Sequence, residues 1–229
     1  MKLLVDDVSQ DLHIHTDFSD GDESIDIIIH RARLLNLRNI SITDHDNMYA
    51  YKHINIKELK QEGINLIYGV ELSCLHNDKR IHLLAYNINP NLFHLLKPVF
   101  YKNFPGHVNK YLSLVNAKKL IHLLGGKLIL AHPYKYNHDL KGEDLLKLVI
   151  ENGYIDGIEC FHSYHNEQEI KTLLEYASKY NLLVSAGSDY HYYGRKVREN
   201  KSSKGLSYLS VIDSTIEKTL NKYLNKIGR

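Results

Sequence analysis

Short apolar segments alternate with amphipathic ones along most of the chain. Alternating or continuous apolar runs predict strands over residues 11–16, 40–43, 66–73, 80–86, 128–131, 157–160 and 183–187. Apolar residues at helical spacing predict helices over residues 24–37, 47–62, 110–124, 143–152 and 166–180. Seven strands that alternate with helices indicate an α/β protein with a parallel sheet, which could be open or closed into a barrel.

Residues 90–109 interrupt this alternation. They contain Pro98, Pro105 and Gly106 among several aromatic residues, which favours an irregular excursion over a further strand. A chain of 229 residues has the size of one domain, so we expect residues 90–124 to form a short insert or lid within a single domain spanning residues 1–229. A strand or loop over residues 206–212 and a helix from residue 214 would complete the chain.

Composition narrows the class of protein. The formal net charge of +2 argues against a broad nucleic-acid-binding surface. Cys74 and Cys160 lie far apart without a CxxC spacing, which indicates a reducing compartment. No apolar run approaches the ~20 residues of a membrane span, and the N-terminal segment is too short and acidic for a signal peptide. We therefore expect a soluble, cytoplasmic protein without membrane contact or an obligate protein partner.

The placement of the 15 histidines carries more information than their number. His13 and His15 lie two apart in a predicted strand, so both point to the same face. Taken alone, this pair could equally be hydrogen-bonded core residues. The other predicted strands deliver seven more histidines or acids, mostly at their C-terminal ends: Asp20, His45, Glu71, His82, His132, Asp189 and His191. Active sites of α/β barrels are built at that end.

These residue types point to metal chemistry. Imidazole and carboxylate together suit Mn, Fe and Zn. One ion takes about four to six ligands, so nine candidates indicate two or three divalent ions. With only Asp20, Glu71 and Asp189 as acids, such a site stays cationic and attracts an anion such as a phosphoryl group. Adjacent ions could supply a bridging hydroxide as nucleophile and stabilise the leaving oxygen, which predicts hydrolysis of a phosphate ester.

In combination, the motifs resemble the polymerase and histidinol phosphatase (PHP) family of metal-dependent phosphoesterases. The matching segments are residues 11–16 (DLHIHT), 19–21 (SDG), 42–45 (ITDH), 130–133 (LAHP) and 187–191 (GSDYH), and residues 69–73 (GVELS) and His82 fit two further positions. The resemblance implies a distorted (β/α)7 TIM-like barrel, the PHP fold, with a trinuclear metal site.

The resemblance also implies how the ligands are shared among three ions. One ion would be surrounded by His13, His15, Glu71 and Asp189. The second would be held by Asp20, His45 and His191, and the third by a bridging Glu71 with His82 and His132. Asp44 would orient His45 or another ligand, or take part in catalysis.

Within the family, the SDG and GVELS segments look most like small bacterial phosphoesterases that act on nucleotides and short oligonucleotides. Those proteins carry a helical insert before the segment that matches residues 130–133, and residues 90–124 are a shortened version here. The resemblance therefore implies a phosphomonoesterase, or a nucleotide or oligonucleotide phosphoesterase, with a small phosphorylated substrate.

Substrate-binding and acid–base residues are predicted from charge and position. Lys135 follows the turn after His132, and Arg195 follows His191, so either could reach a phosphate from the rim. An ordinary solvated surface cation is the alternative for both. Glu159 and His162 end a predicted strand, and one of them could orient a ligand or act as general acid to the leaving group.

Three other functions share these motifs. Histidinol-phosphate phosphatases tend to be longer, and no residue here marks an imidazole-binding pocket. The PHP-type tyrosine phosphatases carry paired acids before the first glycine, unlike residues 17–21 (DFSDG). A non-catalytic PHP module that has lost ligands is disfavoured, since all nine ligand positions are filled and no polymerase is attached.

Overall fold

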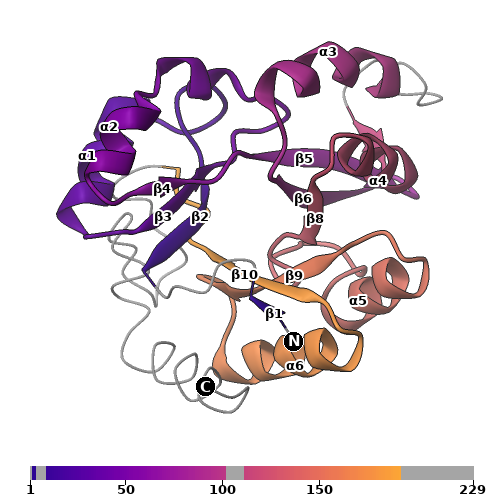
Figure 1. Ribbon diagram of the computed structural model, residues 1–229. Coiled ribbons are helices and arrows are strands. Elements are labelled where there is room, and N and C mark those ends of the chain that lie inside the picture. The colour runs from indigo at the N-terminus through magenta and orange to yellow at the C-terminus, as the bar shows by residue number, and fades with distance from the viewer. Residues whose placement is uncertain (1, 4–8, 102–110, 192–229) are drawn as a thin grey trace.

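The computed structural model describes residues 2–3, 9–101 and 111–191. In chain order the strands are β1 (Lys2–Leu3), β2 (Gln10–Ile14), β3 (Asn39–Ile42), β4 (Asn65–Leu66), β5 (Gly69–His76), β6 (Lys79–Tyr86), β7 (Leu112–Ser113), β8 (Lys127–Leu130), β9 (Gly157–His162) and β10 (Leu183–Gly187). The helices are α1 (Ile25–Leu34), the 3-10 helix η1 (Tyr49–His53), α2 (Ile56–Gln61), α3 (Pro90–Tyr101), α4 (Leu114–Leu123), α5 (Gly142–Glu151) and α6 (Glu167–Lys179). The helices lie around the outside of the strands (Figure 1).

The strands form two sheets, which confirms an α/β fold but not one parallel sheet. One sheet has the order β1-β10-β9-β8-β6-β5-β7, and the other has the order β2-β3-β4. Strand β6 is antiparallel to both β5 and β8, while the other pairs are parallel. Only Asn77 and Asp78 join β5 to β6, and both have a positive φ, as the tight turn of an antiparallel hairpin requires. The prediction of an all-parallel sheet was wrong at this hairpin.

The predicted strand over residues 66–73 is divided between the two sheets. β4 pairs with β3, whereas β5 begins at Gly69 and pairs with β6. Isolated bridges join the sheets where Ile14 pairs with Tyr190 and where His45 pairs with Glu71. The described residues therefore form two linked sheets and no closed one.

Two helix predictions need correction. The helix expected over residues 47–62 is split into η1 and α2, because Ile54 is extended and Asn55 caps a new helix by accepting the N–H of Glu58. The region expected to be irregular begins with α3. The side chain of Asn89 caps α3 by accepting the N–H groups of Asn91 and Leu92, and Pro98 lies inside the helix.

The second half of the predicted insert is part of the scaffold. Helix α4 buries Leu114, Ala117, Leu120 and Ile121 and packs against β5 and β8. Residues 102–110, the predicted segment 206–212 and the predicted C-terminal helix lie outside the described residues. Among the described helices, none combines the length and the apolar character needed to cross a membrane.

Candidate metal centre

Glu71 lies near the start of β5 with a side chain that is almost fully buried. Its Oε2 lies 3.3 Å from Nε2 of His13 and 3.1 Å from Nε2 of His15. The same oxygen lies 3.3 Å from Nδ1 of His45, which follows β3. The first two rings come from the end of β2, where residues two apart share a face as predicted. One carboxylate oxygen is thus surrounded by three imidazoles from two elements.

The other oxygen of Glu71 faces two further histidines. Oε1 lies 3.0 Å from Nδ1 of His82 and 3.1 Å from Nε2 of His132. His132 follows β8, but His82 comes from the middle of the antiparallel β6 and not from a strand end. The hydroxyl of Tyr136 accepts the backbone N–H of His82 at 2.8 Å and fixes β6 here. Tyr136 was not identified from the sequence, since a tyrosine in a loop carries no metal-ligand signal.

Asp189, which follows the end of β10, lies close to His13 and His15. Its Oδ1 lies 3.4 Å from Nε2 of His13 and 3.3 Å from Nε2 of His15. Backbone hydrogen bonds hold this turn against β2: the N–H of His15 donates to the carbonyl of Tyr190 at 2.8 Å. The bridge between the two sheets therefore also brings Asp189 to the cluster.

Asp20 marks the exposed side of the cluster, with a side chain that is 54% exposed. Its Oδ2 lies 3.2 Å from Nε2 of His191 and 3.6 Å from Nε2 of His45, and its Oδ1 lies 3.5 Å from Nδ1 of His15. The rings of His15 and His191 stack with centroids 4.2 Å apart. Asp20 is therefore the most exposed of the nine side chains predicted as ligands.

The nine side chains predicted as ligands lie in one continuous cluster. The described residues contain four groups whose ligand atoms all lie within 4.8 Å of one another: His15, Asp20, His45 and His191; His13, Glu71, His132 and Asp189; His45, Glu71 and His82; and His13, Glu159 and His162. Glu71 belongs to two of the groups, as a bridging carboxylate would. The fourth group adds two residues outside the predicted ligand set.

Unpaired polar atoms test whether this cluster fits metal ions. His13 Nε2, His15 Nε2, His45 Nδ1 and Glu71 Oε2 are all buried and have no hydrogen-bond partner among the described residues. They face one another at 3.1–3.3 Å without hydrogen-bond geometry. Burying such atoms without a partner costs about 1–3 kcal/mol each. They are therefore expected to bind an ion or molecule that supplies the missing partner. Lone pairs that converge on one space fit divalent cations.

The electrostatics of the metal-free cluster point the same way. Burial opposes the charged ring of His15, but the carboxylates of Asp189 and Glu71 outweigh it and raise its pKa to about 9. Burial likewise opposes charge on Glu71, and the surrounding imidazoles, His13 first, hold its pKa well below the usual range. At His132 burial prevails and lowers the pKa to about 3. Protons on some histidines thus balance the buried acids, and a bound cation would replace them.

Glu159 contacts two of the histidines, the ring of His13 and the backbone of His132. Fully buried on β9, it lies with Oε1 2.9 Å from Nδ1 of His13 and accepts the backbone N–H of His132 at Oε2, 2.8 Å away. A carboxylate on the far nitrogen turns Nε2 of His13 toward Glu71, as in many metal sites. Glu159 or His162 was predicted to orient a ligand or to act as general acid, and Glu159 makes the orienting contact.

Two aspartates fix the backbone around the cluster. Both oxygens of Asp44 are occupied by Thr16, whose N–H and hydroxyl donate at 2.7 and 2.8 Å, and Ser19 donates to one of them at 2.7 Å. Asp44 thus holds the turn that leads to Asp20. It was expected to orient His45 or another ligand, and the hydroxyl of Ser19, which donates to Asp44, lies 3.5 Å from Nδ1 of His15. Asp11 accepts the N–H and the hydroxyl of Ser188 and ties β2 to the end of β10.

Close backbone approach explains one motif glycine. A Cβ at Gly187 would lie 2.3 Å from the Cβ of His13 and 2.9 Å from Oε1 of Glu159. Only glycine lets β10 pass this close to the ligand strand. Immediately after strand ends, His132 and Asp189 adopt positive φ values of 28° and 56°, which non-glycine residues rarely do. The chain is thus constrained where it presents these two side chains.

Besides Asp44 and Glu159, two more of the predicted substrate and acid–base residues are described, Lys135 and His162. The ammonium group of Lys135 forms an ion pair with Oδ2 of Asp189. His162 is fully buried, with Nε2 3.7 Å from that same oxygen. Arg195 lies outside the described residues.

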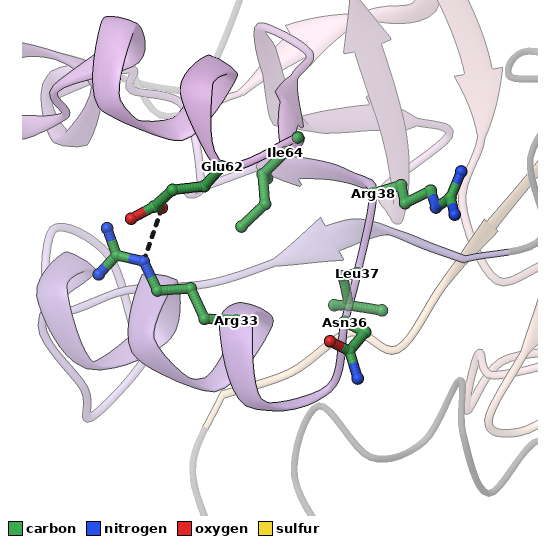
Figure 2. A pocket seen from close by; sticks show the side chains of 7 residues that line it. Arg33, Asn36, Leu37, Arg38, Glu62 and Ile64 are labelled. Atoms are coloured by element: carbon green, nitrogen blue, oxygen red, sulfur yellow. Dashed lines mark hydrogen bonds and ion pairs between the residues drawn. The ribbon is translucent and has the colours of Figure 1, made fainter.

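A cavity of about 720 Å³ lies at the opposite end of the three-stranded sheet. Figure 2 shows it between the C-terminal end of α1 and the segment that precedes β4. Arg33 and Glu62 on its wall form an ion pair at 2.7 Å, and Arg38 also lines it. No histidine lines this cavity, so it is distinct from the cluster around Glu71.

The cluster and the fold together define a class, the metal-dependent hydrolases whose ligands are imidazole and carboxylate. The family model described as the PHP domain matches residues 11–197, which is most of the chain. The chain therefore belongs to the PHP domain family and is a metal-dependent phosphoesterase.

Known relatives agree with this assignment. The chain is 24% identical to the 5'-3' exoribonuclease Rnm of Escherichia coli over 80% of this chain and 85% of that protein. It is 21% identical to the phosphoribosyl 1,2-cyclic phosphate 1,2-diphosphodiesterase of Eggerthella lenta, over 80% and 94% of the two chains. A solved structure from Bifidobacterium adolescentis, described as a metal-dependent phosphoesterase, shares the fold with a TM-score of 0.65 at 21% identity, covering 86% of this chain and 91% of that chain.

Proposed function

We propose that this chain hydrolyses phosphate esters of nucleotides or short oligonucleotides at a centre of two or three divalent metal ions. The observation that carries the proposal is the position of Glu71, a buried carboxylate surrounded by five imidazoles. The imidazoles around this carboxylate are either neutral or carry a proton that a cation can displace. Such a carboxylate is suited to bridge two cations.

The ligand groups suggest how the ions are shared. Asp20, His45 and His191, with His15, would hold one ion on the exposed side, and His13, Asp189 and Glu71 would hold another in the interior. Glu71 with His82 would contribute to a third, together with either His45 or His132. Mn, Fe and Zn all suit these ligands. Bound ions would activate a water for attack and offset the charge that develops on the phosphoryl group.

The protein's own groups then orient and bind. Glu159 fixes the ring of His13, and Asp44 holds the turn that carries Asp20. Lys135 reaches the cluster with its charged end and is proposed to bind a phosphate oxygen. Arg195 is proposed as a second phosphate ligand on the strength of its position in the sequence, four residues after His191.

Two observations favour a nucleotide over another small phosphate ester. The first relative is named as an exoribonuclease, an enzyme that acts on RNA, while the second is named for a phosphoribosyl cyclic phosphate, a ribose phosphate without a base. Tyr164 is 37% exposed, stacks on His162 with ring centroids 5.7 Å apart and lies 5.5 Å from the ammonium of Lys135. An exposed aromatic ring beside a cationic group is suited to stack a base.

Part of the proposal concerns the scaffold. We infer that β2, β3, β5, β6, β8, β9 and β10 correspond to the seven strands of a distorted (β/α)7 barrel, whose two seams would be the isolated bridges at His45 and Tyr190. In this interpretation, residues 1–229 form one PHP domain and α3 is the main part of its short insert. Buried, unpaired Cys74 and Cys160 support a reducing, cytoplasmic setting.

Metal-dependent hydrolysis tests the function directly. Chelator-treated protein should release no phosphate from p-nitrophenyl phosphate or nucleoside monophosphates, and added Mn²⁺ should restore release. Glu71→Gln should lose at least one metal equivalent and nearly all activity, whereas Glu167→Gln on the exposed start of α6 should match the wild type. Short RNA, 3′,5′-bisphosphates and histidinol phosphate in the same screen separate the substrate classes. Full activity in Glu71→Gln would refute the proposed centre.

A further inference from the structure

His162 lies at the end of β9 beside the cluster, but its hydrogen bonds differ from those of the other histidines. Its Nδ1 accepts the backbone N–H of Tyr164 at 3.1 Å. Its Nε2 is buried, has no hydrogen-bond partner among the described residues and points toward Asp189, 3.7 Å from Oδ2. The ring is fully buried, and the ring of Tyr164 stacks on it.

The partner at Nδ1 determines where the ring proton of His162 resides. A backbone N–H can only donate, so Nδ1 must present its lone pair and the proton must be on Nε2. His191 shows the opposite arrangement, because its Nδ1 faces the carbonyl oxygen of Asp189 at 2.9 Å, which can only accept. His13 resembles His191, with Glu159 at its Nδ1. Those two rings therefore direct a lone pair into the cluster, whereas His162 directs an N–H.

A metal ion binds a lone pair and is repelled by an N–H. We infer that His162, although its atoms are close enough to His13 and Glu159 to complete a metal site, is a hydrogen-bond donor to an anionic phosphoryl oxygen and not a ligand. The inference rests on the proposed function, since it identifies which wall of the centre receives the phosphate.

A second donor converges on the same place from another element. Lys135, in the loop after β8, forms its ion pair with the Asp189 oxygen that Nε2 of His162 faces. An oxygen of a bound phosphate beside this point would receive one ammonium and one imidazole N–H, a combination typical of anion sites. Burial, the bond from Tyr164 and the stacked ring hold His162 in this orientation, so the donor is positioned before the anion arrives.

Metal content and phosphate affinity together test the inference on the full, Mn²⁺-loaded chain. His162→Leu should retain the wild-type number of metal equivalents by plasma mass spectrometry. Its dissociation constant for inorganic phosphate, measured by calorimetry, should rise by roughly tenfold or more, because a hydrogen bond to a charged group is lost. His162→Gln places an amide N–H near the former Nε2 and should recover most of the affinity. His132→Ala serves as the reference for loss of a ligand.

Two results would overturn the inference. Loss of a metal equivalent in both His162 variants, as in His132→Ala, would make His162 a ligand. Unchanged phosphate affinity in His162→Leu would remove the donor role. If His162→Leu does not fold, His162→Asn replaces it, since its shorter amide cannot reach the Nε2 position. Neither readout depends on turnover, so a wild type that binds phosphate in this pattern but hydrolyses no ester would refute the proposed function alone.

Discussion

At the scale of single residues, Glu159 contacts two of the nine predicted ligands without belonging to them. One of its oxygens meets Nδ1 of His13, and the other accepts the backbone N–H of His132. Both contacts are fully buried, so water cannot substitute for either. The carboxylate therefore decides which nitrogen of His13 faces Glu71.

Glu159→Gln should weaken metal binding by about 10- to 100-fold, the usual effect of removing a carboxylate behind a ligand histidine. The amide has one acceptor oxygen for two donors, so His13 or His132 loses its partner. Titration of the metal-free protein with Mn²⁺ measures the affinity. Glu169→Gln, in the capping box of α6, is the control and should bind metal as the wild type does. Wild-type affinity in Glu159→Gln would show that the ring of His13 is held by other contacts.

At the scale of elements, helix α3 fixes the turn that carries His45. The ammonium of Lys97 contacts the carbonyl of Asp46, and the hydroxyl of Tyr101 contacts its carboxylate. The same carboxylate accepts the N–H of Ser73 at 3.0 Å, so α3, the turn and β5 meet at one residue with a φ of 54°. Helix α3 thus contacts the turn that carries His45 into the candidate metal centre.

Tyr101→Phe should reduce the affinity of any metal site that includes His45 by roughly fivefold, because it removes one hydrogen bond of about 1 kcal/mol to Asp46. Sites without His45 should be unaffected, so a Mn²⁺ titration should separate weakened sites from unchanged ones. Leu95→Ala is the matched control on α3, since Leu95 is 69% exposed. Equal effects of the two substitutions would mean that α3 acts only through general stability.

At the scale of the whole molecule, metal binding and protonation are linked through His15. Its pKa of about 9 means that the metal-free protein carries a proton there at neutral pH, which a cation must displace. In the metal-free chain a raised histidine pKa stabilises the fold below about pH 6.5, and this contribution is lost as the pH rises through about 9.

The stabilisation by Mn²⁺ should therefore increase between pH 6.5 and pH 9. The metal-free chain loses the stabilising proton over this range, while the metal ion competes with fewer protons. Differential scanning calorimetry with and without chelator measures the difference in Tm, and calorimetric titration in two buffers of different ionisation enthalpy measures the released proton. A difference in Tm that stays constant across this range would contradict the pKa assigned to His15.

Most elements could be predicted because their patterns are local. The apolar spacing of α1, α5 and α6 and the apolar strands β3, β8 and β10 needed no tertiary information. The hairpin of β5 and β6 had a local signal as well, the Asn77–Asp78 pair between two apolar runs, but the alternation of strands and helices along the chain favoured a parallel sheet. Helix α3 could not be inferred in the same way, because Pro98 lies inside it and its cap at Asn89 resembles a turn.

The sequence by itself determined the chemistry, that is, which side chains meet at the centre. Ligand types recurred at the ends of apolar strands, and a strand places His13 and His15 on one face. It also determined the family, through motifs that span most of the chain. Only the tertiary structure decided how those side chains are used. In His13 and His162 the far nitrogen faces a partner that is distant in sequence or set by the local turn, Glu159 for His13 and the Tyr164 N–H for His162. That partner fixes whether the ring offers a lone pair or a proton, and no pattern along the chain records it.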